Sequence, residues 1–224
     1  MIDFNEMADN FVRRESRPKT IGRYYPSEIG MCIRKVWYSY VDPKDLSPDL
    51  LKIFSLGHMI HDLVVDIFKS EKNPHIELVK SELPFKAEID DFLISGRIDN
   101  LIMIKADSTN LLVEVKSTAD LKYVSNPSPH NIDQLQLYMH FTGTHDGILL
   151  YIDKKNMASR VFYLPYDEKH AEKVIDKFRL LHMCLKKEIV PEPEARMGSK
   201  MKWMCRMCEY RETCYKETPQ EILS

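Results

Sequence analysis

This sequence has little glycine, no long apolar run and almost no net charge. Only 7 of its 224 residues are glycine, and no repeat or low-complexity tract occurs, which excludes solenoid and linker-rich architectures. No apolar run reaches the roughly 18 residues of a membrane span. The N-terminus, Met1-Ile2-Asp3, lacks the basic and apolar regions of a secretory signal. The sequence therefore predicts an intracellular, cytoplasmic protein.

The net charge of -2 argues against a protein that coats DNA through charge alone. The charge is unevenly distributed, because residues 1–35 and 186–216 are mildly basic and the middle is acidic. A centre that binds a cation and ends that contact an anion would have this distribution, and so would ordinary solvated surfaces. Any contact with nucleic acid must be local.

Hydrophobic residues make up 44% of the chain, enough for one packed core, and their periodicity predicts alternating helices and strands. The predicted helices are 27–40, 51–69, 131–141 and 167–187, and the predicted strands are 76–86, 92–105, 111–117, 147–152 and 160–164. This order predicts an α/β fold with a mixed central sheet flanked by helices, with the helix 131–141 as a crossover between strands. We expect one domain over 1–224, made of an N-terminal helical arm (1–50), a core (51–190) and a C-terminal cysteine module (191–224).

A carboxylate and an ammonium group are predicted to share one face of the strand 111–117. Glu114 and Lys116 are two residues apart, so they project to the same side, and Val113 and Val115 point to the other. A hairpin with the preceding strand would bring Asp99 beside Glu114, and two close carboxylates repel unless a cation lies between them. Mg²⁺ or Mn²⁺ favours such oxygen ligands, although a Glu-x-Lys pair is also common on ordinary strands. With a nearby lysine to orient a water molecule, this set suits phosphodiester hydrolysis.

Two helices add side chains to this group. His61, on the helix 51–69, could reach the sheet as a further metal ligand, although a lone helical histidine is more often at the surface or packed. Gln134 and Tyr138 are four residues apart and therefore share one face of the helix 131–141. That face could contact a phosphate strand or only pack.

Three of the five cysteines lie within ten residues, in the pattern C-x-x-C-x-Y-x-x-x-C formed by Cys205, Cys208 and Cys214. A two-residue gap suits two ligands of one metal centre, and Cys32 is the candidate for a fourth ligand. Four thiolates suit either Zn²⁺ or a 4Fe-4S cluster, and the spacing does not separate them. Cys184 fits no such pattern and is predicted to be a core residue.

Taken in order, Gly57-x-x-x-His61, Gly96-x-x-Asp99, Glu114-Val115-Lys116 and Gln134-x-x-x-Tyr138 resemble the RecB-like branch of the PD-(D/E)XK nuclease superfamily. The resemblance implies His61, Asp99, Glu114 and Val115 as metal ligands for Mg²⁺ or Mn²⁺. It implies Lys116 as the residue that positions the attacking water, and Gln134 and Tyr138 as organisers of the site or substrate. Ile98 stands where the proline of the superfamily name would be.

A core of this kind between an N-terminal cysteine and a C-terminal cysteine module resembles the iron-sulfur nucleases, and in length the fourth CRISPR-associated protein family. The resemblance implies a 4Fe-4S cluster at Cys32, Cys205, Cys208 and Cys214. It also implies a DNA exonuclease on single-stranded ends that trims DNA before spacer integration, with the integrase subunits as partners. Oligomeric state stays open, a homo-oligomer included. The rival hypotheses are a phage- or virus-encoded recombination or repair nuclease, a non-catalytic DNA-binding adaptor and a zinc-stapled structural protein.

Overall fold

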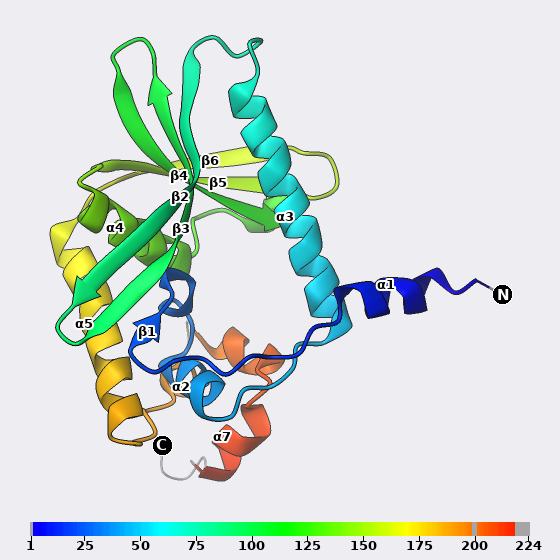
Figure 1. Ribbon diagram of the computed structural model, residues 1–224, viewed down its shortest axis with the longest axis vertical. Helices are drawn as coiled ribbons and strands as arrows, with labels where there is room; N and C mark the ends of the chain where they lie inside the picture. Colours follow the sequence, from blue (N-terminus) through cyan, green and yellow to red (C-terminus); the bar gives the residue numbers. More distant parts are fainter. Residues whose placement is uncertain (1, 199–200, 218–224) are drawn as a thin grey trace.

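The computed structural model describes residues 2–198 and 201–217, and in this part of the chain six strands form one mixed sheet (Figure 1). The strands are β1 (Arg23–Tyr24), β2 (Ile76–Ile89), β3 (Phe92–Ile104), β4 (Thr109–Thr118), β5 (Asp146–Asp153) and β6 (Ser159–Pro165). The α-helices are α1 (Phe4–Val12), α2 (Ile33–Val41), α3 (Pro48–Lys69), α4 (Pro129–Thr142), α5 (Glu168–Lys186), α6 (Glu194–Met197) and α7 (Arg211–Glu217). Short 3₁₀ helices are η1 (Pro26–Glu28), η2 (Leu121–Tyr123) and η3 (Lys202–Met207).

Both antiparallel and parallel pairs occur in the sheet. The β2–β3, β3–β4 and β5–β6 pairs are antiparallel, whereas β4 pairs in parallel with β5 and β1 with β3. A parallel pair needs a crossover connection, and α4 supplies it between β4 and β5. The predicted order of elements, the mixed sheet and the role of this helix are thereby confirmed.

Helices cover both faces of the sheet, because β4 is apolar on both sides. Leu112 belongs to the cluster formed with α2, α4 and α5, whereas Val113 and Val115 pack with Ile60 and Val64 of α3. Full burial of such side chains contributes roughly 1.5–3 kcal/mol each. The same alternation directs Glu114 and Lys116 toward the α4 side of the sheet.

One edge of β3 is only partly paired. β2 runs along the whole of the other edge, while on this edge β1 pairs with Leu93 and Ile94 and β4 pairs from Asn100 onward. Among the described residues, no strand pairs on this edge with the intervening stretch, which includes Gly96 and Asp99. The sheet is therefore open where the predicted site residues of β3 lie.

The predicted helix 27–40 begins later than expected. Ser27 lies in η1, and α2 starts at Ile33. Between η1 and α2 the chain makes a turn, in which the Met31 N–H donates to the Glu28 carbonyl over 3.0 Å. The turn packs against α4 at Gly30, where an added Cβ would lie 1.7 Å from the Cβ of His130.

Several elements have no counterpart in the prediction, namely α1, α6 and α7, the 3₁₀ helices η2 and η3 and the two-residue strand β1. The predicted cysteine module, 191–224, includes residues 199–200 and 218–224, which lie outside the described part of the chain. Across 2–198 and 201–217, no helix is both long and apolar enough to cross a membrane.

Candidate active site

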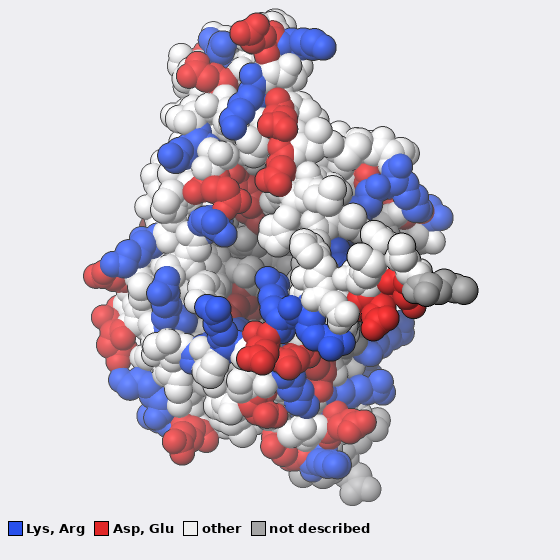
Figure 2. Space-filling model, turned by 45° about the vertical axis from the view of Figure 1, so that its right-hand side comes forward, with Lys and Arg blue, Asp and Glu red and all other residues white. Residues whose placement is uncertain are grey.

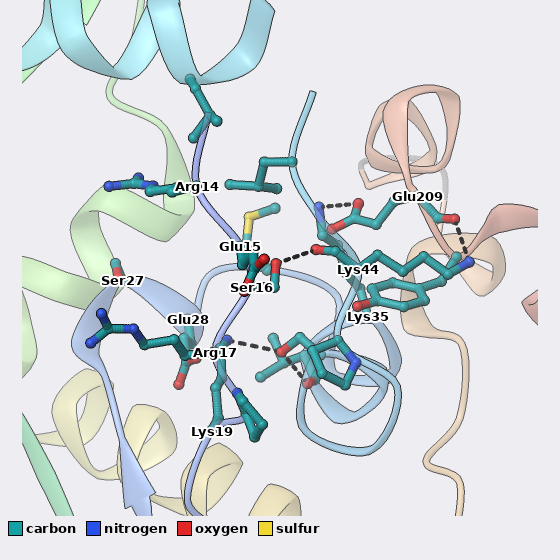
Figure 3. A pocket seen from close by; sticks show the side chains of 18 residues that line it. Arg14, Glu15, Ser16, Arg17, Lys19, Ser27, Glu28, Lys35, Lys44 and Glu209 are labelled. Carbon is teal, nitrogen blue, oxygen red and sulfur yellow. Dashed lines mark hydrogen bonds and ion pairs between the residues drawn. The ribbon is translucent and has the colours of Figure 1, made fainter. Parts of the chain in front are cut away.

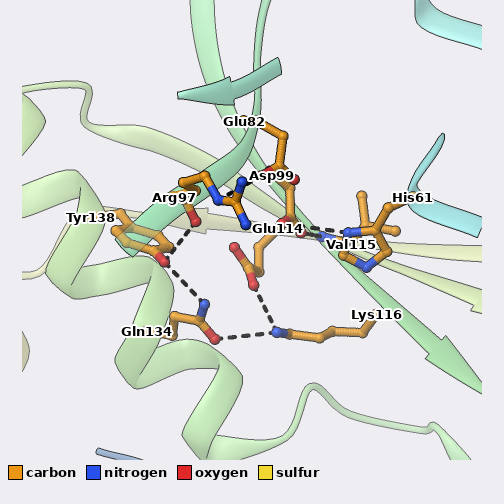
Figure 4. Close-up of polar contacts among 9 residues, drawn as sticks. All are labelled: His61, Glu82, Arg97, Asp99, Glu114, Val115, Lys116, Gln134 and Tyr138. Carbon is orange, nitrogen blue, oxygen red and sulfur yellow. Dashed lines mark hydrogen bonds and ion pairs between the residues drawn. The ribbon is translucent and has the colours of Figure 1, made fainter. Parts of the chain in front are cut away.

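The side chains of Glu114 and Lys116 form an ion pair at the C-terminal end of β4. The Lys116 Nζ lies 2.7 Å from Glu114 Oε1 and donates a second hydrogen bond, 3.2 Å long, to Gln134 Oε1 (Figure 4). Glu114 is only 2% exposed, and its other oxygen, Oε2, is buried with no partner among the described residues. A buried carboxylate oxygen without a partner is unfavourable and marks a position where a cation would be stabilised.

Asp99 approaches this pair from β3, at the edge of that strand which has no partner strand among the described residues. Its Oδ2 accepts a hydrogen bond of 2.7 Å from the Val115 N–H, so the carboxylate takes the place of a missing strand neighbour. Its Oδ1 lies 3.5 Å from Nδ1 of His61 on α3. The N–H and C=O of a strand residue point to the same side, so the Val115 carbonyl is directed to the side on which Asp99 lies.

Gln134 and Tyr138 connect the ion pair to the open edge of β3. The Gln134 amide donates to the Tyr138 hydroxyl over 3.2 Å, and that hydroxyl donates to the Arg97 carbonyl over 3.0 Å (Figure 4). Both side chains are buried. α4 therefore holds Lys116 through Gln134 and is itself fixed to β3 through Tyr138.

The charged side chains of the site shift one another's pKa values. Burial raises the pKa of Glu114 to about 7, and the neighbouring Asp99 acts in the same direction against Lys116. Burial by itself would lower the pKa of Lys116 and of His61, but the carboxylates outweigh it, so both values are raised. The carboxylates thus favour the charged forms of Lys116 and His61.

These residues line a cavity of about 1040 Å³, which we call the central cavity. Its walls come from α3, β3, β4, α4 and the segment 23–27, and the predicted residues that line it are His61, Asp99, Glu114, Lys116, Gln134 and Tyr138. The structure thus brings all six side chains of the expected set to one opening. Val115 contributes its backbone, since its side chain is buried on the α3 side.

Several polar residues of the cavity were missed by the sequence analysis. Arg97 lines it and pairs with Glu82 at 2.8 Å, while Arg23 and Lys154 come from elements far apart in the sequence. Strand alternation from Asp99 could have found Arg97, two residues earlier on the same face. No local signal marks Arg23 or Lys154, because the tertiary fold alone places them there.

The cysteines of the two ends of the chain meet in a second place. Cys32, Cys205, Cys208 and Cys214 line one small cavity of about 20 Å³. Burial raises the pKa of Cys205, and the nearby thiols of Cys32 and Cys214 add to the effect. Cys184 is 3% exposed and packs in the hydrophobic core with Leu185 and Phe178, away from this cavity.

Cations surround the four thiols, since Arg34, Lys35, Arg196 and Arg211 line the same cavity. The Arg34 guanidinium lies 4.0 Å from the Cys214 sulfur. Positive neighbours favour the thiolate form that metal ligands require. In the described residues, however, no group of three or more His, Cys, Asp or Glu side chains is arranged closely enough to hold a metal ion, here or in the central cavity.

Comparisons with known proteins place this geometry in a family. The crystal structure of SSO0001 superposes with a TM-score of 0.67 and 21% identity, covering 96% of this chain and 97% of that one. That of an alkaline exonuclease, LHK-Exo, from Laribacter hongkongensis superposes with a TM-score of 0.53 and 14% identity, covering 75% and 90% of the two chains. At these identities both show the fold alone.

Sequence comparison is more specific. No curated protein sequence matches this chain significantly. The profile of the PD-(D/E)XK nuclease superfamily, in contrast, matches residues 31–215, which include the six predicted side chains of the central cavity and all four cysteines of the second cavity. The chain belongs to the PD-(D/E)XK nuclease superfamily.

Proposed function

We propose that this protein is a divalent-metal-dependent DNA exonuclease that acts on single-stranded ends. The observation that carries the proposal is the Glu114–Lys116 ion pair, which lies in an open cavity beside Asp99. Hydrolysis of a phosphodiester needs a positioned water molecule and positive charge near the phosphoryl oxygens. A partly exposed ammonium paired with one carboxylate, with a second carboxylate on the same cavity of about 1040 Å³, meets both needs.

The oxygen atoms of the site fit Mg²⁺ or Mn²⁺. Glu114 Oε2 is buried without a partner among the described residues, and Asp99 lies on the same opening. We propose Asp99, Glu114, the Val115 carbonyl and His61 as the residues that would hold the ion. When bound, such an ion polarises the phosphodiester and lowers the pKa of a water molecule.

The protein side chains would then divide the remaining work. Lys116 is placed to orient the attacking water and to neutralise charge on the phosphate, because its ammonium points into the cavity. Gln134 fixes that ammonium through its carbonyl oxygen, 3.2 Å away. Tyr138 positions Gln134 and does not itself face Lys116 directly. Positioning of this kind accounts for a large share of the rate in such reactions.

The test is a nuclease assay with the wild type and Lys116→Met, using 5′- and 3′-labelled single strands and Mg²⁺ or Mn²⁺. Lys105→Met is the matched control, because Lys105 is exposed beyond the end of β3 and lines neither cavity. We expect Lys116→Met to remain folded and to lose at least about 10²-fold in rate, the range for removal of one electrostatic group, and the control to cut like the wild type.

Equal rates in the two variants would contradict the role of Lys116. Digestion by neither the wild type nor the variants, with DNA still bound, would favour the non-catalytic adaptor. The 5′- and 3′-labels also report the polarity of digestion in the same experiment.

We further propose a 4Fe-4S cluster at Cys32, Cys205, Cys208 and Cys214. Four thiols on one cavity, ringed by cations, support a thiolate-bound group, and a cluster there would tie the two ends of the chain together. Binding energy of such a group adds to folding energy. Zinc is the alternative for the same donors.

Cys208→Ala and Cys184→Ala form a matched pair for this proposal. We expect anaerobically purified wild type and Cys184→Ala to be brown, with iron and acid-labile sulfide, and Cys208→Ala to be colourless and poorly soluble. A colourless wild type that contains zinc would replace the cluster by zinc. A brown, stable Cys208→Ala protein would show that the ligand set is wrong.

The biological context we propose is the trimming of DNA before its integration as CRISPR spacers. The support is the resemblance of the chain, with its core and both cysteine arms, to the fourth CRISPR-associated family. Co-purification with the integrase subunits of the same organism tests it. Failure to associate, with activity intact, would favour a phage- or virus-encoded recombination or repair nuclease.

A further inference from the structure

A second large cavity lies next to the central one, on the side of the cysteine module. It has a volume of about 1030 Å³, at the upper end of the roughly 300–1,000 Å³ that ligand pockets occupy. One wall is the segment 13–20 between α1 and β1, which we call the strap. The others are α2, the loop 42–47 and the residues Glu209 and Tyr210 of the cysteine module. We call this space the strap cavity.

Positive charge dominates the strap cavity once its internal ion pairs are set aside. Five cations line it, but Lys19 pairs with Glu28 at 2.6 Å and Lys35 pairs with Glu209 at 2.9 Å. Lys44 lies over the Tyr210 ring, 4.9 Å from its centre. Outside these two ion pairs, the lining of the cavity has three cations, Arg14, Arg17 and Lys44, and one carboxylate, Glu15.

The strap is anchored to the loop 42–47, and its two cavity-lining arginines are exposed. The strap is fixed at Ser16, whose N–H donates to Asp45 and whose hydroxyl donates to the Lys44 carbonyl, both over 2.7 Å. Arg14 and Arg17 are exposed, and neither has an ion-pair or hydrogen-bond partner among the residues described. Figure 3 shows both guanidinium groups on the same side of the strap, the side on which Ser27 lies.

Ser27 joins this space to the central cavity, because it lines both. It belongs to η1, so this one 3₁₀ helix is the wall between them. On the central side of η1 stands Tyr25, 39% exposed, whose ring is available to stack on a base. One face of the molecule is hollowed near its middle, and Lys and Arg side chains gather below the hollow (Figure 2).

We infer that the strap cavity binds the sugar-phosphate backbone of a single DNA strand whose end lies in the central cavity, with Arg14 and Arg17 on its phosphates. The inference rests on the proposed function and assigns a binding place to the part of the substrate strand that lies outside the central cavity. A positively charged groove with an adjacent aromatic ring is the usual means of binding single strands without sequence preference.

The experiment measures binding in a Lys116→Met background, so that the strand is not cut. Fluorescence anisotropy compares Arg14→Gln/Arg17→Gln with Arg13→Gln/Lys105→Gln, which loses the same charge from exposed residues outside both cavities. The ligands are a labelled thymidine decanucleotide and a labelled dinucleotide. For the decanucleotide we expect the strap variant to bind roughly 10- to 30-fold more weakly at about 0.1 M salt, with a salt slope smaller by about 1.4. The dinucleotide, which fills only the central cavity, should bind both variants equally.

Arg14→Lys/Arg17→Lys keeps the charge and should restore most of the affinity, which a merely structural role of the arginines would not predict. Equal decanucleotide affinity in the strap and control variants, with both folded, would overturn the inference. Equal weakening for the dinucleotide would do so too, since it would place the arginines at the site of cleavage. The two proposals can fail separately. If only decanucleotide binding depends on Arg14 and Arg17, but the wild type does not cut DNA, the role of the strap cavity would be supported and the proposed function alone would be overturned.

Discussion

The contact between Gly30 and α4 makes a severe and specific prediction for Gly30→Ala. The new Cβ would lie 1.7 Å from the Cβ of His130 and 2.4 Å from its Cα. Carbon atoms in ordinary contact are about 3.5–4.0 Å apart, so the two segments must separate by about 2 Å. A change of side-chain rotamer cannot relieve the overlap, because Cα and Cβ do not move with rotation about χ1.

Overpacking of a well-packed contact costs about 1–3 kcal/mol and occasionally more, and a clash with backbone belongs at the upper end. We therefore expect Gly30→Ala to lower the free energy of unfolding by about 3 kcal/mol. For a chain of this size each kcal/mol corresponds to roughly 2–4 °C in melting temperature, so the expected decrease is about 6–12 °C. α4 carries Gln134 and Tyr138 one and two turns after His130, so activity should fall as well.

Two other glycines serve as controls in the same thermal and urea denaturation measurements. Gly57 lies inside α3, where an added Cβ would be 3.6 Å from the Ser117 hydroxyl, and Gly57→Ala should stabilise by about 0.5–1 kcal/mol. Gly143 ends α4 with a φ of 69° and has open space around it, so Gly143→Ala should cost about 1–2 kcal/mol. A Gly30→Ala protein that melts within a degree of the wild type, or above Gly143→Ala, would refute the reasoning.

Two further substitutions test the charges and the hydrogen bonds of the fold. Lys186 and His182 hold the pKa of Asp91 at about 2, below its ordinary 3.8, so the carboxylate stabilises the protein above that ordinary value and loses the effect as the pH falls through 2. Asp91→Asn should therefore melt below the wild type at pH 7, and a difference that persists at pH 2 would contradict this linkage. Tyr138→Phe leaves the Gln134 amide and the Arg97 carbonyl without their partner and should cost about 1–3 kcal/mol and lower the cleavage rate. Unchanged stability and rate would show that this hydroxyl positions nothing.

The sequence predicted those parts of the fold that have a hydrophobic period. Helix α3 shows apolar residues at intervals of three and four, and β4 alternates, so their types and order were predictable. The face shared by Glu114 and Lys116 followed from the same alternation. In contrast, β1 has two residues, too few for any pattern, and it exists because Arg23 and Tyr24 meet β3 in space.

The features of the fold and site that the sequence did not predict depend on contacts between segments far apart in the chain. The turn before α2 packs at Gly30 against His130, 100 positions away in sequence, and no local propensity reports this contact. The strap has no periodicity, so Arg14 and Arg17 read as solvated charges until the fold places them beside η1. The proximity of Asp99 to Val115 was partly predictable from the hairpin, whereas the bond between carboxylate and backbone was not.

The position of the site follows from the open edge of β3. Where β1 and β4 leave this strand unpaired, its neighbourhood is completed by side chains, since Tyr138 donates to the Arg97 carbonyl and Asp99 accepts from the Val115 N–H. Tyr138 is hydrogen-bonded to Gln134, which in turn accepts a bond from Lys116. Val115, to which Asp99 is bonded, lies between Glu114 and Lys116 in the sequence. The geometry of the ion pair is therefore coupled to the edge of β3 through α4. A displacement of α4 would break two contacts at once, that of Tyr138 with the Arg97 carbonyl and that of Gln134 with Lys116. For this reason the central cavity can be preorganised by backbone contacts before any ion or DNA strand is bound.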